Sequence, residues 1–390
     1  MISNSKKLEC LFHYIRSKCN AYYYDLLKNR FIFGIFNNIS LSIIFPMLYK
    51  GCGLELPQNK KYIRKINKAA EELYKKILIL DVNKLEIGDY NKRYLSNIKK
   101  SLYNQLQRYA YILIWILSEN NYELEKIKFL DYGGGTGVLS LLAKQLGITE
   151  VYYNDIYDIS CKDAKKIADA LHLPKRDYIE GDLDNVIQYC NKTHIYFNGI
   201  GSYDVIEHIY DIDDFFMNIH RIADETCTMF MCTSANPYNK MIKKRLIKGH
   251  RIAETMQRKK VYGWKERDSI YAYRDIRKNI IEEYIKENNI QLAEEQIQIL
   301  ADKTIGLIEQ DIKKSIDIYI QDGKLPKVDQ KYPSNTCDPY TGNWAEHLLD
   351  FEQLLKILKS TSFHRNRSVP SIKNASHSNH ISIYAIRNHK

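Results

Sequence analysis

The chain has 390 residues, of which 45% are hydrophobic and 27% are charged, and its 58 Lys and Arg outnumber its 47 Asp and Glu. This is ordinary globular usage, which excludes a disordered, a collagen-like and a coiled-coil protein. The surplus of +11 favours anionic partners wherever the cations gather on one surface.

Cysteine spacing and hydropathy predict a cytoplasmic protein. The eight cysteines include no Cys-x-x-Cys pair, so they do not indicate a zinc site, and we expect reduced thiols. Residues 1–20 lack the apolar stretch of a signal peptide, and no apolar run is long enough for a membrane span. We expect 31–49 to be a buried helical piece; a peripheral membrane contact stays an alternative because Lys18, Lys28 and Arg30 precede it.

Residues 1–120 are predicted to form an N-terminal helical region. Apolar residues recur at helical spacing over 59–80, and a further helix is predicted over 95–117. The segment before these two helices contains residues that favour turns, namely Gly51, Gly53 and Pro57.

The sequence pattern changes at Lys126, where short apolar segments typical of strands begin to alternate with amphipathic segments typical of helices. Strands are predicted at 127–131, 150–156, 177–182, within 194–205 and at 226–233, and helices at 138–146, 161–171 and 213–223. This alternation predicts an α/β fold with a doubly wound parallel sheet and right-handed crossovers. We assign residues 121–238 to the first part of this α/β core.

The remaining chain is predicted to interrupt the sheet and then to complete it. Residues 239–323 are charged and helical without strand texture, which indicates an insertion of several helices after the fifth strand. In 324–390 a loop leads to Asp350, a predicted N-cap with Gln353 three residues on, as in a capping box. A helix over 351–358 and strands at 362–367 and 381–387 would complete the core.

The strongest motif is a glycine loop at the first strand-to-helix turn, Phe-Leu-Asp-Tyr-Gly-Gly-Gly-Thr-Gly at 129–137. Glycines there let the backbone approach a ligand, and the next helix offers free N–H groups. A dinucleotide fingerprint needs G-x-G-x-x-G, but Val138 stands at the third glycine position, which argues against an NAD enzyme. Asp131 closes the strand, and an acid there suits a cationic ligand.

Three more acids follow predicted strands. Asp155, Asp182 and Asp204 end the second, third and fourth strands, on the side where open α/β sheets bind ligands. Asp155 is placed to accept hydrogen bonds from both hydroxyls of a ribose. Asp182 is placed to accept from an adenine amino group, with Asp184 competing for that role.

In order and spacing these motifs resemble the class I S-adenosylmethionine-dependent methyltransferases, over 126–234 and 350–387. The segment Asp131-x-Gly133-x-Gly135-x-Gly137 is similar to their first motif, Asp155 to their ribose acid and Gly181-Asp182 to their adenine-side acid. Three further segments resemble the ubiquinone-methyltransferase-like branch: Asp-Val-Ile-Glu-His-Ile at 204–209, Thr-Ser-Ala-Asn-Pro at 233–237 and Gly-Asn-Trp-Ala-Glu-His-Leu at 342–348. The aromatic-Asp pair that usually begins that branch's fourth strand is missing here.

The resemblance implies a methyltransferase with a Rossmann-like sheet and with S-adenosylmethionine as the cofactor. The N-terminal helices and the helical insertion lie outside this family core, so the resemblance does not assign the acceptor. We expect a small molecule or glycan, anionic or neutral, that is methylated on oxygen or nitrogen. The cofactor-binding residues it implies are Asp131, Gly133, Gly134, Gly135, Gly137, Asp155, Ile156, Asp182 and Leu183.

The candidate catalytic residues are Asp204, Glu207 and His208, for which three interpretations stay open. His208 deprotonates the acceptor, or the trio holds a divalent ion, or it forms a structural network at a helix start. No other metal ligand is predicted. Glu346 and His347 are expected to be structural, and Trp264 and Trp344 are expected to pack.

A basic run follows the fifth strand. Residues 240–267 contain eleven Lys and Arg against two Glu, which would steer an anionic acceptor to the ligand side of the sheet. A solvated helix face is an equal alternative. Two other functions stay open: an RNA methyltransferase of the same fold, whose phosphates would follow this run, and a non-catalytic scaffold.

Overall fold

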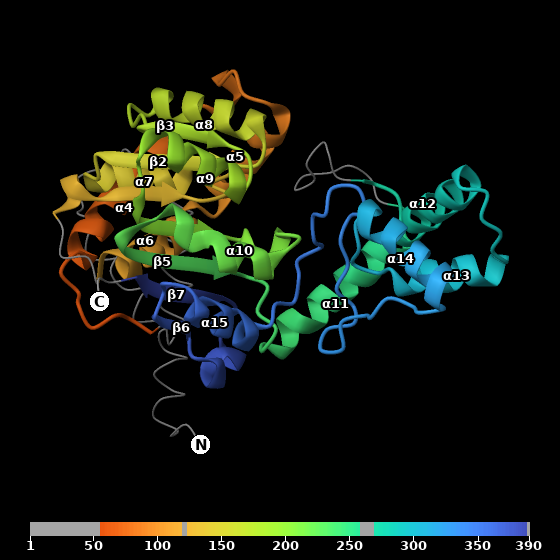
Figure 1. Cartoon of the computed structure of the whole chain (residues 1–390). Helices are drawn as coiled ribbons and strands as arrows, with labels where there is room; N and C mark the ends of the chain where they lie inside the picture. The colour runs from red at the N-terminus through yellow and green to blue at the C-terminus, as the bar shows by residue number, and fades with distance from the viewer. Residues whose placement is uncertain (1–54, 119–122, 258–268, 388–390) are drawn as a thin grey trace.

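Helices pack on both faces of one seven-stranded sheet in the computed structural model, and a separate group of helices projects to one side (Figure 1). The structure describes residues 55–118, 123–257 and 269–387. Segment 31–49, Trp264 and residues 258–267 of the basic run lie outside the described residues.

The sheet has the order β3-β2-β1-β4-β5-β7-β6, and the predicted α/β fold class is confirmed. Its first five strands are parallel, and β7 is antiparallel to both β5 and β6. The strands are β1 Lys128–Asp131, β2 Glu150–Asp155, β3 Asp177–Glu180, β4 Phe197–Tyr203, β5 Ala223–Thr233, β6 Arg365–Val369 and β7 Ile381–Arg387. The short segment between β6 and β7 permits antiparallel pairing, which needs no crossover helix.

Two hydrophobic cores cover the two faces of the sheet. One contains α4 Ile63–Ile79, α6 Leu102–Ser118 and α7 Val138–Leu146. The other contains α9 Leu183–Thr193, α10 Ile212–Asn218 and α15 Phe351–Ser360. Trp115 of α6 is fully buried and stacks on Phe230 of β5 at 5.7 Å between ring centroids, which fixes this helix against the sheet.

The structure corrects three details of the helix predictions. The helix expected over 95–117 is two helices, α5 Asp89–Lys100 and α6, separated at Ser101. Helix α9 was not predicted at all. Asp350 does cap α15, but the Gln353 side chain donates to Asp213 instead of returning to the cap as a capping box requires.

The helical insertion predicted after the fifth strand is present. It consists of α11 Lys240–Thr255, α12 Tyr273–Glu287, α13 Glu294–Lys303 and α14 Glu309–Asp322. The last three helices share a small core of their own with the end of α11, and α11 connects this group to β5 (Figure 1). The domain boundaries at 120, 238 and 323 stay predictions.

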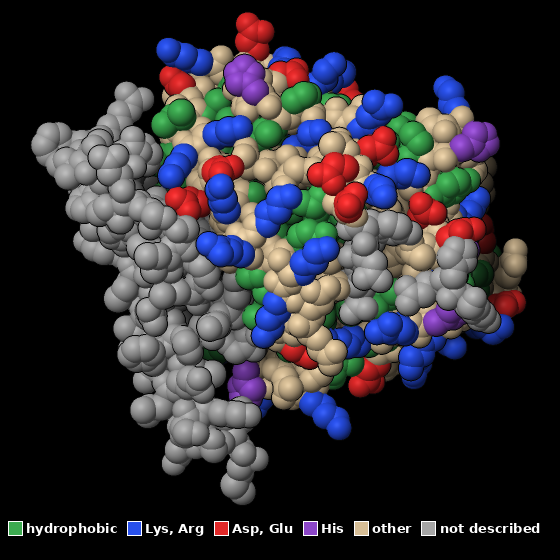
Figure 2. Space-filling view, turned by 90° about the vertical axis from the view of Figure 1, so that its left-hand side faces the viewer, with side chains coloured by type: hydrophobic (Ala, Val, Ile, Leu, Met, Phe, Trp, Pro, Cys, Tyr) green, Lys and Arg blue, Asp and Glu red, His purple; other side chains and the backbone are tan. Residues whose placement is uncertain are grey.

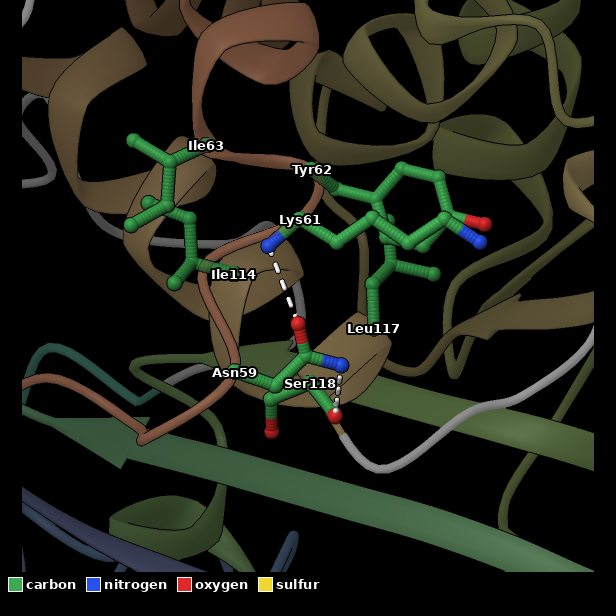
Figure 3. A pocket seen from close by; sticks show the side chains of 7 residues that line it. All are labelled: Asn59, Lys61, Tyr62, Ile63, Ile114, Leu117 and Ser118. Atoms are coloured by element: carbon green, nitrogen blue, oxygen red, sulfur yellow. Dashed lines mark hydrogen bonds between the residues drawn. The ribbon is translucent and has the colours of Figure 1, made fainter.

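None of the helices in the described part of the chain combines the length and the apolar character needed to cross a bilayer. A hollow between the start of α4 and the end of α6, where the Asn59 amide donates to the Ser118 carbonyl oxygen at 2.8 Å, encloses no space for a water molecule (Figure 3). Ser118 ends α6 near the amino ends of the parallel strands, away from their carboxyl ends.

Candidate functional site

The glycine loop between β1 and α7 has a backbone that only glycine accommodates. Gly133, Gly135 and Gly137 have φ of 66°, 56° and 74°. A Cβ atom on Gly133 would lie 2.6 Å from the Val205 side chain, and one on Gly134 would lie 2.6 Å from the Tyr153 ring. The loop therefore presents bare backbone at the carboxyl end of β1, as the sequence predicted.

Asp131 lies under this loop and supports it. Its Oδ2 accepts the Ser140 N–H in the first turn of α7 at 2.9 Å. Burial raises the pKa of Asp131 to about 6, an increase that the bonds from Ser140 and the charge of Lys175 only partly oppose. The site thus carries a buried carboxylate whose pKa is raised by its surroundings.

Asp155 ties the loop to the end of β2. Its Oδ2 accepts the Gly135 N–H at 3.0 Å, and its Oδ1 accepts the Tyr157 N–H at 3.0 Å. The adjacent Ile156 side chain is 53% exposed. A carboxylate and an exposed apolar side chain therefore lie together beside the loop.

Lys175 is a part of this site that sequence reasoning missed. Its ammonium group is buried between the rings of Tyr153 and Tyr178, 5.4 and 5.2 Å from their centroids, and a Cβ atom on Gly137 would lie 2.9 Å from it. Burial lowers its pKa to about 7. A single lysine in a connection has no spacing signal, so only the packing of the loop against β2 could reveal it.

Asp182 and Leu183 have local roles that the sequence prediction did not include. The Asp182 side chain caps α9 by accepting the N–H groups of Asp184 and Asn185, and the Asn185 side chain bonds back to the Asp182 N–H. Leu183 is buried in the core under the sheet. Asp182 stays exposed, so its contact with an adenine remains a prediction.

The trio after β4 is not arranged as one open cluster. Asp204 has φ of 54° and accepts the Ser234 N–H at 2.7 Å, whereas Glu207 is only 1% exposed. Burial and the charge of Asp204 raise the pKa of Glu207 well above its usual value. Within the described residues, no three His, Cys, Asp or Glu side chains are grouped so that they could hold a metal ion.

His208 is oriented by the late loop. Its Nδ1 lies 2.9 Å from the carbonyl oxygen of Trp344. A carbonyl can only accept, so Nδ1 carries the proton and the lone pair of the neutral ring is on Nε2. That nitrogen is the one available to accept a proton.

The other residues of the late loop pack as expected. Trp344 stacks on His347, with ring centroids 4.1 Å apart, and on Tyr210 at 6.0 Å. The His347 N–H donates to the Glu207 carbonyl oxygen at 2.9 Å, and burial lowers the pKa of the His347 ring to about 4. Glu346 forms an ion pair with Arg245 at 3.7 Å. These contacts hold the loop against the segment after β4.

A second group that the sequence did not reveal stands at the same edge. Arg108 of α6 donates to the Tyr203 phenol oxygen at 2.9 Å, and that oxygen lies 3.0 Å from Nε2 of His380. Burial lowers the pKa of His380 to about 4. Because β7 runs antiparallel to β5, His380 at its start reaches the carboxyl ends of β4 and β5. Helix α6 and the last strand thus both contribute polar groups beside Asp204.

We expect Glu207→Gln to be tolerated at neutral pH and to change the pH dependence of stability. A raised pKa means that folded Glu207 keeps a proton that the unfolded chain loses above about 4.5, so the wild type loses stability as pH rises. Glutamine has no such proton to lose, and the variant gains stability relative to the wild type over the same range. Urea unfolding at several pH values measures this, and parallel profiles for the two proteins would contradict it.

No protein-family model and no curated protein matches the sequence. A solved S-adenosylmethionine-dependent methyltransferase from Streptococcus mutans, described as putative, is 15% identical and covers 36% of this chain and 37% of its own, with a TM-score of 0.28. The ribosomal protein L11 methylase from Lactobacillus delbrueckii subsp. bulgaricus is 16% identical over 34% and 62% of the two chains, with a TM-score of 0.26. TrmN from Thermus thermophilus is 17% identical over 30% and 35%, with a TM-score of 0.24. The chain spans less than two thirds of the length of each of these proteins.

Proposed function

We propose that the chain is an S-adenosylmethionine-dependent methyltransferase of the ubiquinone-methyltransferase-like branch. The observation that carries this proposal is the bond from Gly135 N–H to Asp155, which joins the glycine loop and the acid after β2 into one site. S-adenosylmethionine, when bound, supplies an electrophilic methyl group on a sulfonium. The protein therefore has to bind the cofactor and the acceptor, orient them and exclude water.

The residues present fit this cofactor. The buried carboxylate of Asp131 suits its cationic methionine end, which would meet the bare backbone from Gly133 to Gly137. Asp155 would accept the ribose hydroxyls, and the exposed Ile156 would cover the adenine. Asp182 would bond the adenine amino group from the start of α9.

The acceptor would lie on the β4–β5 side of the loop. There Nε2 of His208 is available to take a proton from an acceptor oxygen or nitrogen, with Asp204 beside it. Arg108, Tyr203 and His380 would line the same space and bind a polar or anionic part of a small molecule or glycan. A cytoplasmic location belongs to this proposal, because the cysteines in the described residues are free and buried.

Calorimetric titration of the purified chain with S-adenosylmethionine and, separately, with NAD tests the cofactor. We expect saturable binding of the first and none of the second, since Val138 replaces the third glycine of a dinucleotide loop. Binding of neither compound by folded protein, or tighter binding of NAD, would refute the proposal.

The affinity for S-adenosylmethionine is expected to fall as pH drops below about 6, by up to about tenfold per pH unit. Protonation of Asp131 removes the negative charge that the cationic cofactor meets, so the weakly binding form is the protonated one. Titrations across this pH range measure the effect. Asp131→Asn should bind weakly at every pH with a flattened profile, and an unchanged wild-type affinity at low pH would contradict this role of Asp131.

A further inference from the structure

Helix α11 presents an exposed face that combines cations with apolar side chains. Its exposed positive side chains are Lys240, Lys244, Arg245, Lys248 and Arg251. Its single acid, Glu254, is turned inward, where it pairs with the buried Arg277 at 2.7 Å. The solvent side of this helix therefore carries positive charge only.

Most of these cations form no ion pair within the described part of the chain. Arg245 has one carboxylate near it, Glu346 at 3.7 Å, and no described Asp or Glu forms an ion pair with Lys244, Lys248 or Arg251. On the side of the molecule turned away from the insertion, Lys and Arg alternate with Asp and Glu (Figure 2). Residues 240–267 carry eleven Lys and Arg against two Glu, a surplus of nine within the chain's total of +11, so the positive charge is concentrated in this segment.

Large apolar side chains are exposed among the cations. Met241 is 78% exposed and Met256, just past the helix end, is 55% exposed; Ile247 and Ile252 are exposed as well. Met241 and Ile252 are separated by about three helical turns, so they share one face, and Arg245 and Lys248 lie between them. Burying these side chains against an apolar phase would be favourable by the usual hydrophobic effect.

The opposite face of α11 fixes this orientation. Leu246 packs against Tyr332 and Leu348, and Ala253 joins the core of the insertion. The His250 ring donates from Nε2 to the carbonyl oxygen of Glu346 at 3.0 Å. The helix cannot rotate to bury its apolar side chains without losing these contacts, so the face stays available to a partner.

We propose that this face of α11 binds an anionic membrane surface. Cations surrounding exposed methionine and isoleucine side chains match a bilayer interface, where phosphate headgroups lie above acyl chains. A nucleic-acid backbone would use the charges but leave the apolar side chains unused, and α11 contains no Phe, Tyr or Trp on which bases could stack. This inference is independent of the cofactor and of the reaction.

Sedimentation of the full chain with vesicles of equimolar phosphatidylcholine and phosphatidylserine tests the proposal, with pure phosphatidylcholine as reference. We expect binding to the anionic vesicles only. The triple variant Lys244→Glu, Lys248→Glu, Arg251→Glu should lower partitioning by more than about tenfold, since each cation near such a surface contributes to binding. The variant Met241→Ser, Ile252→Ser keeps every charge and should also bind less.

A matched control makes the same change in net charge on α4. Arg64, Lys65 and Lys68 are exposed there, and their replacement by glutamate should leave vesicle binding nearly unchanged. Three results would overturn the proposal: no binding of the wild type, equal loss in the α4 control, or full binding by the Met241→Ser, Ile252→Ser variant. If single-stranded RNA binds in an α11-dependent way while vesicles do not, the surface is a nucleic-acid site instead.

Discussion

Replacing Asp155 by alanine is expected to weaken S-adenosylmethionine binding by about 30- to 150-fold, the equivalent of about 2 to 3 kcal/mol. The substitution removes the proposed acceptor for the ribose hydroxyls and also the anchor of the Gly135 N–H. Both losses act on one ligand, because Asp155 joins the loop after β1 to the end of β2. Calorimetric titration of the variant measures the change.

Asp224→Ala provides the matched control for this variant. Asp224 lies at the opposite edge of the sheet near the start of β5, and its contact with Lys128 is a 3.9 Å surface pair. We expect unchanged affinity there. Equal loss in both variants would indicate general destabilisation, and full binding by Asp155→Ala would refute the role assigned to Asp155.

Replacing Arg277 by methionine is expected to destabilise the helical insertion by about 3 kcal/mol, because it leaves the carboxylate of Glu254, whose side chain is 13% exposed, without its cation. The Arg277 side chain is 1% exposed. Its guanidinium donates to both carboxylate oxygens of Glu254, at 2.9 and 2.7 Å, and its Nε donates to the Ala301 carbonyl oxygen at 2.9 Å. This group therefore connects α11, α12 and α13.

Urea unfolding followed by circular dichroism and limited proteolysis of the insertion measures this loss. The double variant Glu254→Gln, Arg277→Met also removes the unpaired Glu254 carboxylate and should recover much of the stability. Arg274→Met, one turn earlier on α12, breaks an exposed pair with Asp302 and should cost less than about 1 kcal/mol. Similar losses at Arg274 and Arg277 would contradict the special role of the buried pair.

Local patterns were sufficient for much of the core and for the loop. The helix Val138–Leu146 and its stop at Gly147, which has φ of 106°, were predicted to the residue because both depend on neighbours in the chain. Strand β7 was predicted over 381–387 for the same reason. The glycine loop was found because a strand-to-helix turn with positive φ restricts its residue types locally.

The role of Glu207 could not be read in the same way. The sequence offers a carboxylate beside a histidine, which fits a base, a metal ligand or a structural network equally well. Burial of its side chain and the nearby charge of Asp204 decide that its pKa is raised well above the usual value for a glutamate. Neither quantity depends on sequence spacing, since both arise from elements packed together around β4.

The sequence by itself determined the succession of strands along the chain, the glycine loop and the acids at the strand ends. Each of these depends on residue periodicity or on a short turn, and both are local. Only the tertiary structure decided that Lys175 lies beneath the loop, that His380 and Arg108 meet at Tyr203, and that Arg277 is buried. These residues come from segments far apart in the chain, and their chemistry depends on burial and on charges that packing brings near them.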